Sequence, residues 1–308
     1  MMERRTANDG GDKAVFLLTL AAFLAILLMP DLAREGMRSG LLFTARAVIP
    51  SVFPSLVLTD LLFSCDTAAI ENSVGRVFSR LFRVSERGAI AWIAGLIAGF
   101  PVGAITVAND VRAGRLTKEE GEYLLSFVTN TGPAFVVGGV GLGIFGSVGV
   151  GWALYLLQIP VSIVVGLLFR PRTRSRVKEY VRDTRQAPDF VSAVARASEN
   201  CVRIAGFVCF FSVLSALFSR MVPGGLPGAV VSVIFEVGNG AVQAARLAAP
   251  IPAIPLTALA VCFSGLSVVS QSAAAVSGTG MRIRTFLAGK ITAGAVGFIL
   301  SFILCLTK

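Results

Sequence analysis

Gly99-Phe100-Pro101-Val102-Gly103-Ala104 interrupts one apolar run of the chain, and Asn130-Thr131-Gly132-Pro133 interrupts the next. A second pair of interruptions follows in the C-terminal half, Glu236-Val237-Gly238-Asn239-Gly240-Ala241 and then Ser264-Gly265-Leu266-Ser267. Glycine, proline and small polar residues end helices, so each stretch predicts a break inside an otherwise helical segment. Paired breaks in corresponding places of two halves are typical of transporters that bind a solute near the middle of the bilayer.

The composition around the breaks is that of a membrane protein. Of 308 residues, 55% are hydrophobic and 15% charged, and the mean hydropathy is +0.77, whereas about 25% of the residues in a soluble domain are charged. The net charge of +10 comes from basic residues in short segments between apolar runs. That pattern orients membrane helices and does not indicate nucleic-acid binding. We therefore predict an all-α polytopic protein of the cell membrane, with the lipid bilayer and a small solute as partners, compatible with a homo-oligomer.

Seven segments are expected to cross the bilayer, because a spanning helix needs about 20 apolar residues. Five of them are uninterrupted: Ala14–Met29, Gly40–Ser64, Gly151–Phe169, Asn200–Phe218 and Thr285–Leu306. The other two, 122–145 and 254–276, contain the second and fourth breaks.

The remaining two apolar segments are expected to be re-entrant hairpins. Segment 89–110 has basic residues on both flanks, so it begins and ends on the cytoplasmic side and turns back at its break. Segment 230–249 has few basic residues on either flank and is expected to enter and return from the outside. The alternative is that both segments are ordinary spanning helices. Either residues 112–118 or the long basic segment after residue 169 would then lie outside the cell, which contradicts the rule that basic loops stay in the cytoplasm.

The predicted elements form an inverted repeat. Each half holds a span, a hairpin, a broken helix and a closing span, in opposite orientations, as in many transporters. The divisions are an N-terminal helix with its flank (1–39), a first repeat (40–169), a basic cytoplasmic linker (170–198) and a second repeat (199–308). Arg282, Arg284 and Lys290 are interpreted as cytoplasmic charges after the second broken helix. The N-terminus is then cytoplasmic and the C-terminus outside.

The breaks also predict the site, because a broken helix frees backbone groups that can bind a solute. Glu236 is the one acidic residue in the middle of an apolar run. It is expected to bind a solute, Na⁺ or a proton, or else to tie the hairpin tip to a backbone N–H. Amide and hydroxyl side chains at the breaks either contact the solute or cap and pack the helices. The candidate substrate-binding residues are Pro101, Gly103, Asn130, Thr131, Gly132, Glu236, Asn239, Ser264, Gly265, Ser267 and Gln271.

Other chemistry finds little support in the sequence. Histidine is absent and the five cysteines are scattered, so no metal site is expected, and ferrous-iron permeation is a weak alternative. No nucleophile with a matching base is present, so no catalytic residue and no enzyme activity are predicted. No cofactor is expected beyond a coupling ion, either Na⁺ or H⁺.

Residues 99–104 together with 124–138, which include Asn130-Thr131-Gly132-Pro133, make the chain resemble the YlbJ-like sporulation integral membrane proteins. Residues 236–240 and 263–271 resemble the second half of the same family. These proteins belong with the Gate, or nucleoside-recognition, domain proteins, which are related to concentrative nucleoside transporters and to the gate of ferrous-iron transporters. The resemblance implies a permease for a nucleoside-like or other polar solute and a role in sporulation. A non-transporting membrane protein needed for spore cortex or coat morphogenesis is the alternative.

Overall fold

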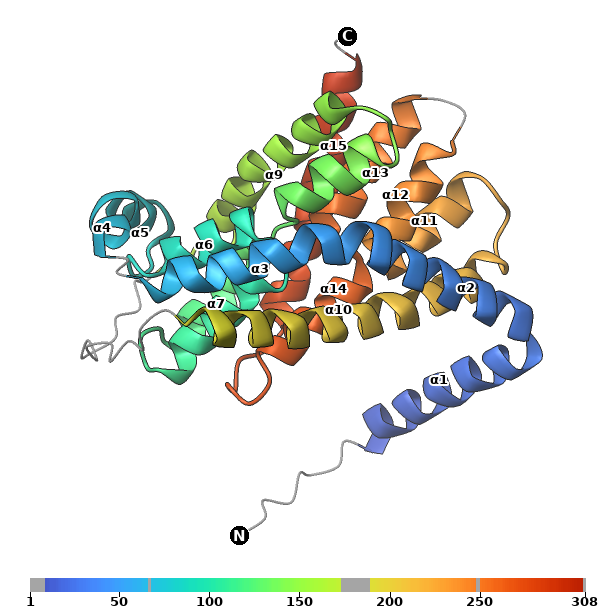
Figure 1. Cartoon of the computed structure of the whole chain (residues 1–308), viewed down its shortest axis with the longest axis horizontal. Coiled ribbons are helices and arrows are strands. Elements are labelled where there is room, and N and C mark those ends of the chain that lie inside the picture. The colour runs from blue at the N-terminus through green and yellow to red at the C-terminus, as the bar shows by residue number, and fades with distance from the viewer. Residues whose placement is uncertain (1–8, 66–67, 173–188, 248–249, 307–308) are drawn as a thin grey trace.

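The computed structural model describes residues 9–65, 68–172, 189–247 and 250–306, and in this part of the chain every regular element is a helix (Figure 1). The first half contains α1 (Asp9–Leu28), α2 (Pro30–Phe43), the π-helical turn η1 (Thr44–Val48), α3 (Ile49–Ser64), α4 (Ala68–Ile70), η2 (Glu71–Gly75), α5 (Arg76–Phe82), α6 (Gly88–Ile97), α7 (Val102–Arg112), α8 (Lys118–Val128), η3 (Ala134–Leu142) and α9 (Val148–Leu168). The second half contains α10 (Phe190–Ser219), α11 (Leu226–Phe235), α12 (Val237–Ala245), α13 (Pro250–Phe263), α14 (Gly265–Ala275) and α15 (Arg284–Leu306). Residues 173–188 of the predicted basic linker lie outside the described residues.

Five helical segments of the described chain are long and apolar enough to cross a membrane: Pro30–Leu62, Val148–Leu168, Phe190–Ser219, Ala253–Ala275 and Arg284–Leu306. Large apolar side chains also remain exposed on the outer helices, for example Leu18 at 71% and Val202 at 72%. Such a surface suits lipid. The prediction of a multi-pass, all-helical membrane protein is therefore confirmed.

The count of seven spans is not reproduced. The first expected span appears as a shorter apolar helix, Lys13–Leu28, and the segment 122–145 is split into α8 and η3. The second expected span begins at Pro30, ten residues before Gly40. The helix continues through charged residues, among them Asp31 and Arg34, which form an exposed ion pair one turn apart.

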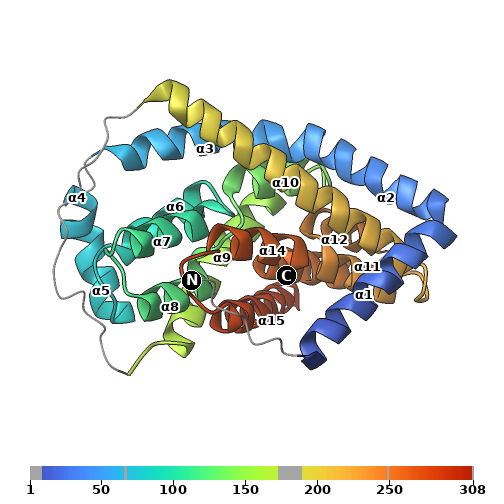
Figure 2. The same ribbon diagram turned by 90° about the horizontal axis from the view of Figure 1, so that it is seen from below.

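Glycines hold this long helix against α10. A Cβ atom on Gly36 would lie 2.7 Å from the Cα atom of Val213, and one on Gly40 would lie 2.9 Å from the Cα atom of Cys209. Only glycine permits so close an approach of two backbones. The continuous helix α2–η1–α3 and α10 consequently run side by side along one edge of the molecule (Figure 2).

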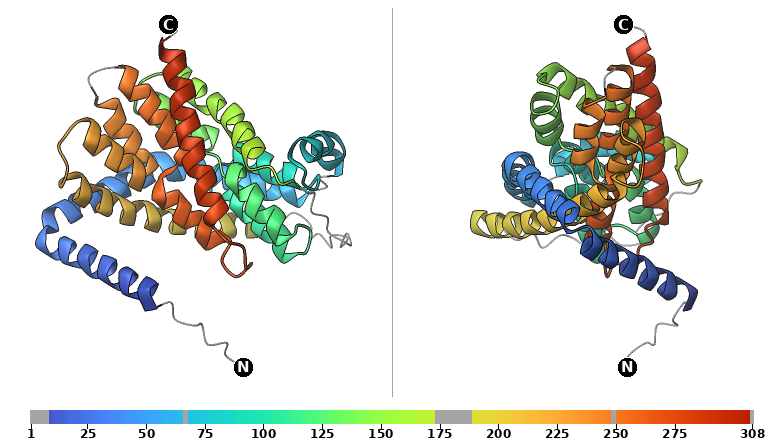
Figure 3. Two further views of the ribbon diagram at one scale, coloured as in Figure 1. Left: turned by 180° about the vertical axis from the view of Figure 1, so that it is seen from behind. Right: turned by 90° about the vertical axis from the view of Figure 1, so that its right-hand side faces the viewer.

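The order of elements in the first half recurs in the second. A long helix (α2–α3 or α10) precedes a pair of short helices (α6–α7 or α11–α12), an interrupted helix (α8–η3 or α13–α14) and a closing helix (α9 or α15). The closing helices run in opposite directions (Figure 1), as an inverted repeat requires. The long upright α15 stands across the horizontal α2 and α10 in Figure 3.

Both expected hairpins are pairs of packed short helices. α6 and α7 are joined by a turn at residues 98–101, and α11 and α12 by the single extended residue Glu236. The breaks thus fall where the sequence predicts them. That each pair dips into the bilayer and returns on the same side stays a prediction.

Candidate solute site at the helix breaks

The tip of the first hairpin lies against the first broken helix. Gly99 has a φ of +80°, and a Cβ atom there would lie 2.4 Å from the nitrogen of Gly132. A Cβ atom on Gly103 would lie 2.5 Å from the carbonyl oxygen of Val128. The backbones touch with no room for side chains, which explains glycine at these predicted positions. Pro101, the second residue of the cis peptide Phe100–Pro101, precedes α7.

The first break, residues 129–133, replaces lost helical hydrogen bonds with side-chain ones. Asn130 donates from Nδ2 to the carbonyl oxygen of Phe127 at 3.2 Å, the capping role that was one of its two predicted roles. The backbone of Thr131 is satisfied by Gln158 on α9. Its N–H donates to Gln158 Oε1 at 2.8 Å, and its carbonyl oxygen accepts from Gln158 Nε2 at 3.0 Å.

The second break lies at Ser264, between α13 and α14. Ser264 and Gly265 both have a left-handed backbone, with φ of +70° and +74°, a conformation that is costly for serine. A Cβ atom on Gly265 would lie 3.1 Å from the Cα atom and from the nitrogen of Glu236. In each half, therefore, the break of the interrupted helix lies against the tip of the preceding hairpin.

The two breaks meet in the interior at what we call the junction, formed by Thr129, Thr131, Val261, Ser264 and Lys290. Thr131 Oγ1 donates to the carbonyl oxygen of Val261 at 2.7 Å and lies 3.3 Å from Ser264 Oγ. Lys290 Nζ donates to the carbonyl oxygen of Thr129 at 2.9 Å and to Ser264 Oγ at 3.0 Å. One ammonium group thus joins the broken helices of both halves.

Lys290 is not the cytoplasmic charge that the sequence suggested. It lies in the second turn of α15 and its side chain is 3% exposed. A Cβ atom on the preceding Gly289 would lie 2.4 Å from the carbonyl oxygen of Ser126, so a glycine brings α15 close to α8. That approach lets the lysine reach the first break. The sequence did not predict this role, because Lys290 follows other basic residues closely and was interpreted together with them.

Glu236 is buried, at 1% exposed, and sits at the N-terminus of α12. Its Oε2 accepts from the N–H of Asn239 at 2.7 Å. A carboxylate at a helix N-terminus is favoured by the helix dipole and by the free N–H groups. This is the tying role that was one of the two predicted for Glu236.

Asn239 lies apart from the junction. It donates from Nδ2 to Ser212 Oγ on α10 at 2.8 Å, and its Oδ1 accepts from Ser39 Oγ on α2 at 3.3 Å. The side chain therefore fastens the second hairpin to the two long helices. It also lines a wide cavity of ≈740 Å³ between α2, α3 and η3.

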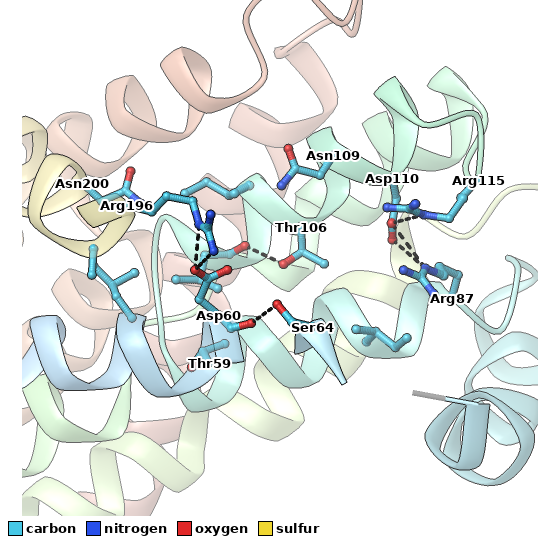
Figure 4. Close-up of a pocket in the computed structure, with 15 residues that line it drawn as sticks. Thr59, Asp60, Ser64, Arg87, Thr106, Asn109, Asp110, Arg115, Arg196 and Asn200 are labelled. Atoms are coloured by element: carbon cyan, nitrogen blue, oxygen red, sulfur yellow. Dashed lines mark hydrogen bonds and ion pairs between the residues drawn. The ribbon is translucent and has the colours of Figure 1, made fainter. Parts of the chain in front are cut away.

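Two neighbouring cavities of ≈220 and ≈270 Å³ share Ile105, Arg196 and Asn200 in their linings, and we call them together the vestibule. Figure 4 shows the first of them between α3, α7 and α10, with the ion pair of Arg196 and Asp60 across it. The second reaches Pro101 at the first hairpin tip and Gln271 on α14.

Among the predicted site residues, Gln271 has a side-chain amide that is only partly satisfied by hydrogen bonds. It is 4% exposed, and its Nε2 donates to Ser267 Oγ at 3.2 Å, one turn earlier. Within the described part of the chain, its buried Oε1 has no hydrogen-bond partner. A buried amide oxygen without a partner is costly, and Gln271 also belongs to the lining of the second vestibule cavity.

A buried ion network closes the other end of the vestibule (Figure 4). Asp110, 2% exposed, pairs with Arg87 at 3.2 Å and with Arg115 at 2.7 Å, and Arg87 also pairs with Glu71 at 2.8 Å. Burial alone lowers the pKa of Arg87, but Asp110 and Glu71 outweigh it and raise that pKa above its ordinary value. The network joins the start of the first hairpin to its end.

The eleven predicted residues thus do not surround one cavity. Pro101 and Gln271 line the vestibule and Asn239 the wide cavity, while Asn130 and Gly132 each border a cavity of ≈10 Å³. The remaining six are closely packed at or near the breaks: Gly103, Thr131, Glu236, Ser264, Gly265 and Ser267. The sequence reasoning missed Gln158 and Lys290, whose signal was a polar residue inside an apolar run.

The fold and the breaks define the class: a multi-pass membrane protein with two interrupted helices that meet in its interior. The chain is 24% identical to the sporulation integral membrane protein YlbJ of Bacillus subtilis (strain 168) over 341 aligned positions, which cover 96% of this chain and 82% of that protein. This similarity along nearly the whole chain supports the resemblance to YlbJ-like proteins. No family model and no solved structure matches the chain, so membership of the Gate group stays a prediction.

Proposed function

We propose that this protein is a transporter or permease for a small polar solute, which it binds at the helix breaks beside the vestibule. The observation that carries the proposal is the junction, where Thr131 and Ser264 of the two broken helices touch. Interrupted helices from two repeats that meet inside the membrane are the usual setting of a transporter's binding site.

The geometry supports a conformation closed at the junction and accessible from the vestibule. The polar groups at the breaks are bonded to one another, whereas Pro101 and Gln271 face a cavity of ≈270 Å³. Such a volume is near the lower end of the range for small-molecule sites. In the proposed cycle a solute enters through the vestibule, and the breaks separate around it. The vestibule then opens to the cytoplasm, with the N-terminus on that side and the C-terminus outside.

The test begins with ligand binding to the purified protein in detergent. Its thermal stability is measured against nucleosides, bases, small organic acids and divalent metals, beside the variant Glu236→Gln. A solute at 100 times its Kd stabilises the folded state by about 2.7 kcal/mol. We expect one class of solute to stabilise the wild-type protein and not this variant. Glu119→Gln, at an exposed position in the first turn of α8, serves as the matched control and should respond as the wild type does.

Uptake of that solute into proteoliposomes then separates transport from mere binding. No stabilisation by any compound and no uptake would favour the non-transporting alternative, in which the fold serves spore morphogenesis as a scaffold. Complementation in a sporulating bacterium distinguishes the two further, because a scaffold should tolerate substitutions at the junction that leave folding intact.

A further inference from the structure

The C-terminal ends of two helices meet at the junction. α8 ends at Val128 and is followed by Thr129, and α13 ends at Phe263 and is followed by Ser264. Each helix C-terminus carries a partial charge of roughly −0.5. Two such ends place negative partial charge in the interior, where water cannot screen it.

Lys290 supplies one positive charge at that point. Its Nζ donates to the carbonyl oxygen of Thr129 and to Ser264 Oγ, at 2.9 and 3.0 Å. Ser264 gives its own proton to the carbonyl oxygen of Val261 at 3.0 Å, so its oxygen is free to accept from the lysine. The ligands of the ammonium group are a carbonyl freed by a helix break and a hydroxyl.

Those ligands are the kind that bind Na⁺ in ion-coupled transporters, where unwound carbonyls and half-helix C-termini coordinate the ion. Here the space beside the lysine is a cavity of only ≈10 Å³, lined also by Ser126, Gln158 and Cys262. That is about the least space that can hold one water molecule. Among the described residues, no acidic side chain lines that cavity, so a metal cation placed there would be repelled by the ammonium group with no carboxylate to offset the repulsion.

We propose that the Lys290 ammonium group occupies the place between the two breaks that a coupling cation would take, so that the protein carries its own cation and does not couple solute movement to Na⁺. The consequence for coupling rests on the proposed transport function; the role of the ammonium group as a resident cation does not. The charge of Lys290 balances the two helix ends when they are together.

The experiment measures the thermal stability of the purified protein in salts of constant ionic strength: NaCl, methylammonium chloride and N-methylglucamine chloride. The wild type should have the same Tm in all three. Lys290→Ala empties the site, so in N-methylglucamine chloride its Tm should lie below that of the wild type. Addition of Na⁺ or methylammonium should then raise the Tm of this variant by about 2–4 °C, and the rise should saturate. Lys290→Met fills the space with an uncharged chain and should be destabilised without a response to either cation.

Lys118→Ala is the matched control, because it removes an exposed lysine at the start of α8. It should behave as the wild type. A wild-type Tm that rises with Na⁺ would overturn the inference even if neither Lys290 variant folds. A Lys290→Ala protein with wild-type stability in every salt would overturn it as well.

Transport assays keep the two proposals apart. Uptake by the wild type that needs a Na⁺ gradient would refute the built-in cation and leave the transporter proposal standing. If the Tm values in the three salts are as expected but no solute is taken up, the inference of a resident cation stands and the transport function is refuted.

Discussion

Replacing Gln158 with leucine should destabilise the protein more than the small difference in side-chain volume suggests. Gln158 is 2% exposed, and its amide pairs with both backbone groups of Thr131, at 2.8 and 3.0 Å. Leucine is close to glutamine in volume, so the substitution removes two hydrogen bonds and leaves little empty space. It strands an N–H and a carbonyl oxygen in the interior.

The magnitude follows from those two groups. A buried backbone group without a partner costs about 1–3 kcal/mol, so two would cost about 2–6 kcal/mol. The cavity beside Gln158, ≈10 Å³, can hold about one water molecule, which would satisfy one of the groups. One group then remains without a partner, so we expect a loss of about 1–3 kcal/mol in the free energy of unfolding.

The assay is unfolding in mixed micelles by increasing SDS, followed by tryptophan fluorescence. Gln158→Glu is the informative partner variant, because a carboxylate still accepts from the N–H of Thr131 but cannot donate to its carbonyl oxygen while ionised. Gln243→Leu, at a half-buried position on α12, controls for the same change elsewhere. If Gln158→Leu unfolds at the same SDS fraction as the wild type, the first break does not depend on this amide and the reasoning is refuted.

Three further predictions concern the hairpins. Gly99→Ala should cost about 2–4 kcal/mol, because a Cβ atom meets the backbone of Gly132; Gly114→Ala, also at positive φ but in open space, should cost about 1–2 kcal/mol, and equal thermal shifts would contradict the proposed contact. Asp110→Ala should cost about 1.5–3 kcal/mol, because it removes the carboxylate shared by the partly buried Arg87 and Arg115, of which Arg87 keeps its pair with Glu71, and retention of full thermal stability would show that the network is dispensable. Glu236→Ala removes the acceptor for the N–H of Asn239 and should lower stability by about 0.5–2 kcal/mol, whereas Glu236→Gln keeps an acceptor and should stay near the wild type in the same measurement; the reverse order would rule out the capping role.

Local signals in the sequence predicted what depends on neighbouring residues. Thr117 and Glu120 form a reciprocal capping box at the start of α8, a feature that needs only two residues three positions apart. The breaks at residues 98–101 and at Ser264 fall where glycine, proline and small polar residues stand in apolar runs. Backbone conformation is set largely within a few residues, so a single chain suffices to locate such features.

Lengths of helices were harder to predict. α2 continues through charged residues because Gly36 and Gly40 fit against the backbone of α10, a contact between segments far apart in the chain. Hydropathy averages over a window and cannot register that contact. The start of the second span was therefore misplaced at Gly40, while its end at Ser64 agrees with the structure.

The sequence by itself determined the class of protein, the two-fold order of its elements and the positions of the helix breaks, because apolar length, charge and backbone preference are local properties. Only the tertiary structure decided what satisfies those breaks. Gln158 and Lys290 come from the two closing helices and reach Thr131 and Thr129 because small residues let the backbones approach. A buried polar group must find a partner wherever the fold brings one, and that partner is fixed by packing in space and not by distance along the chain.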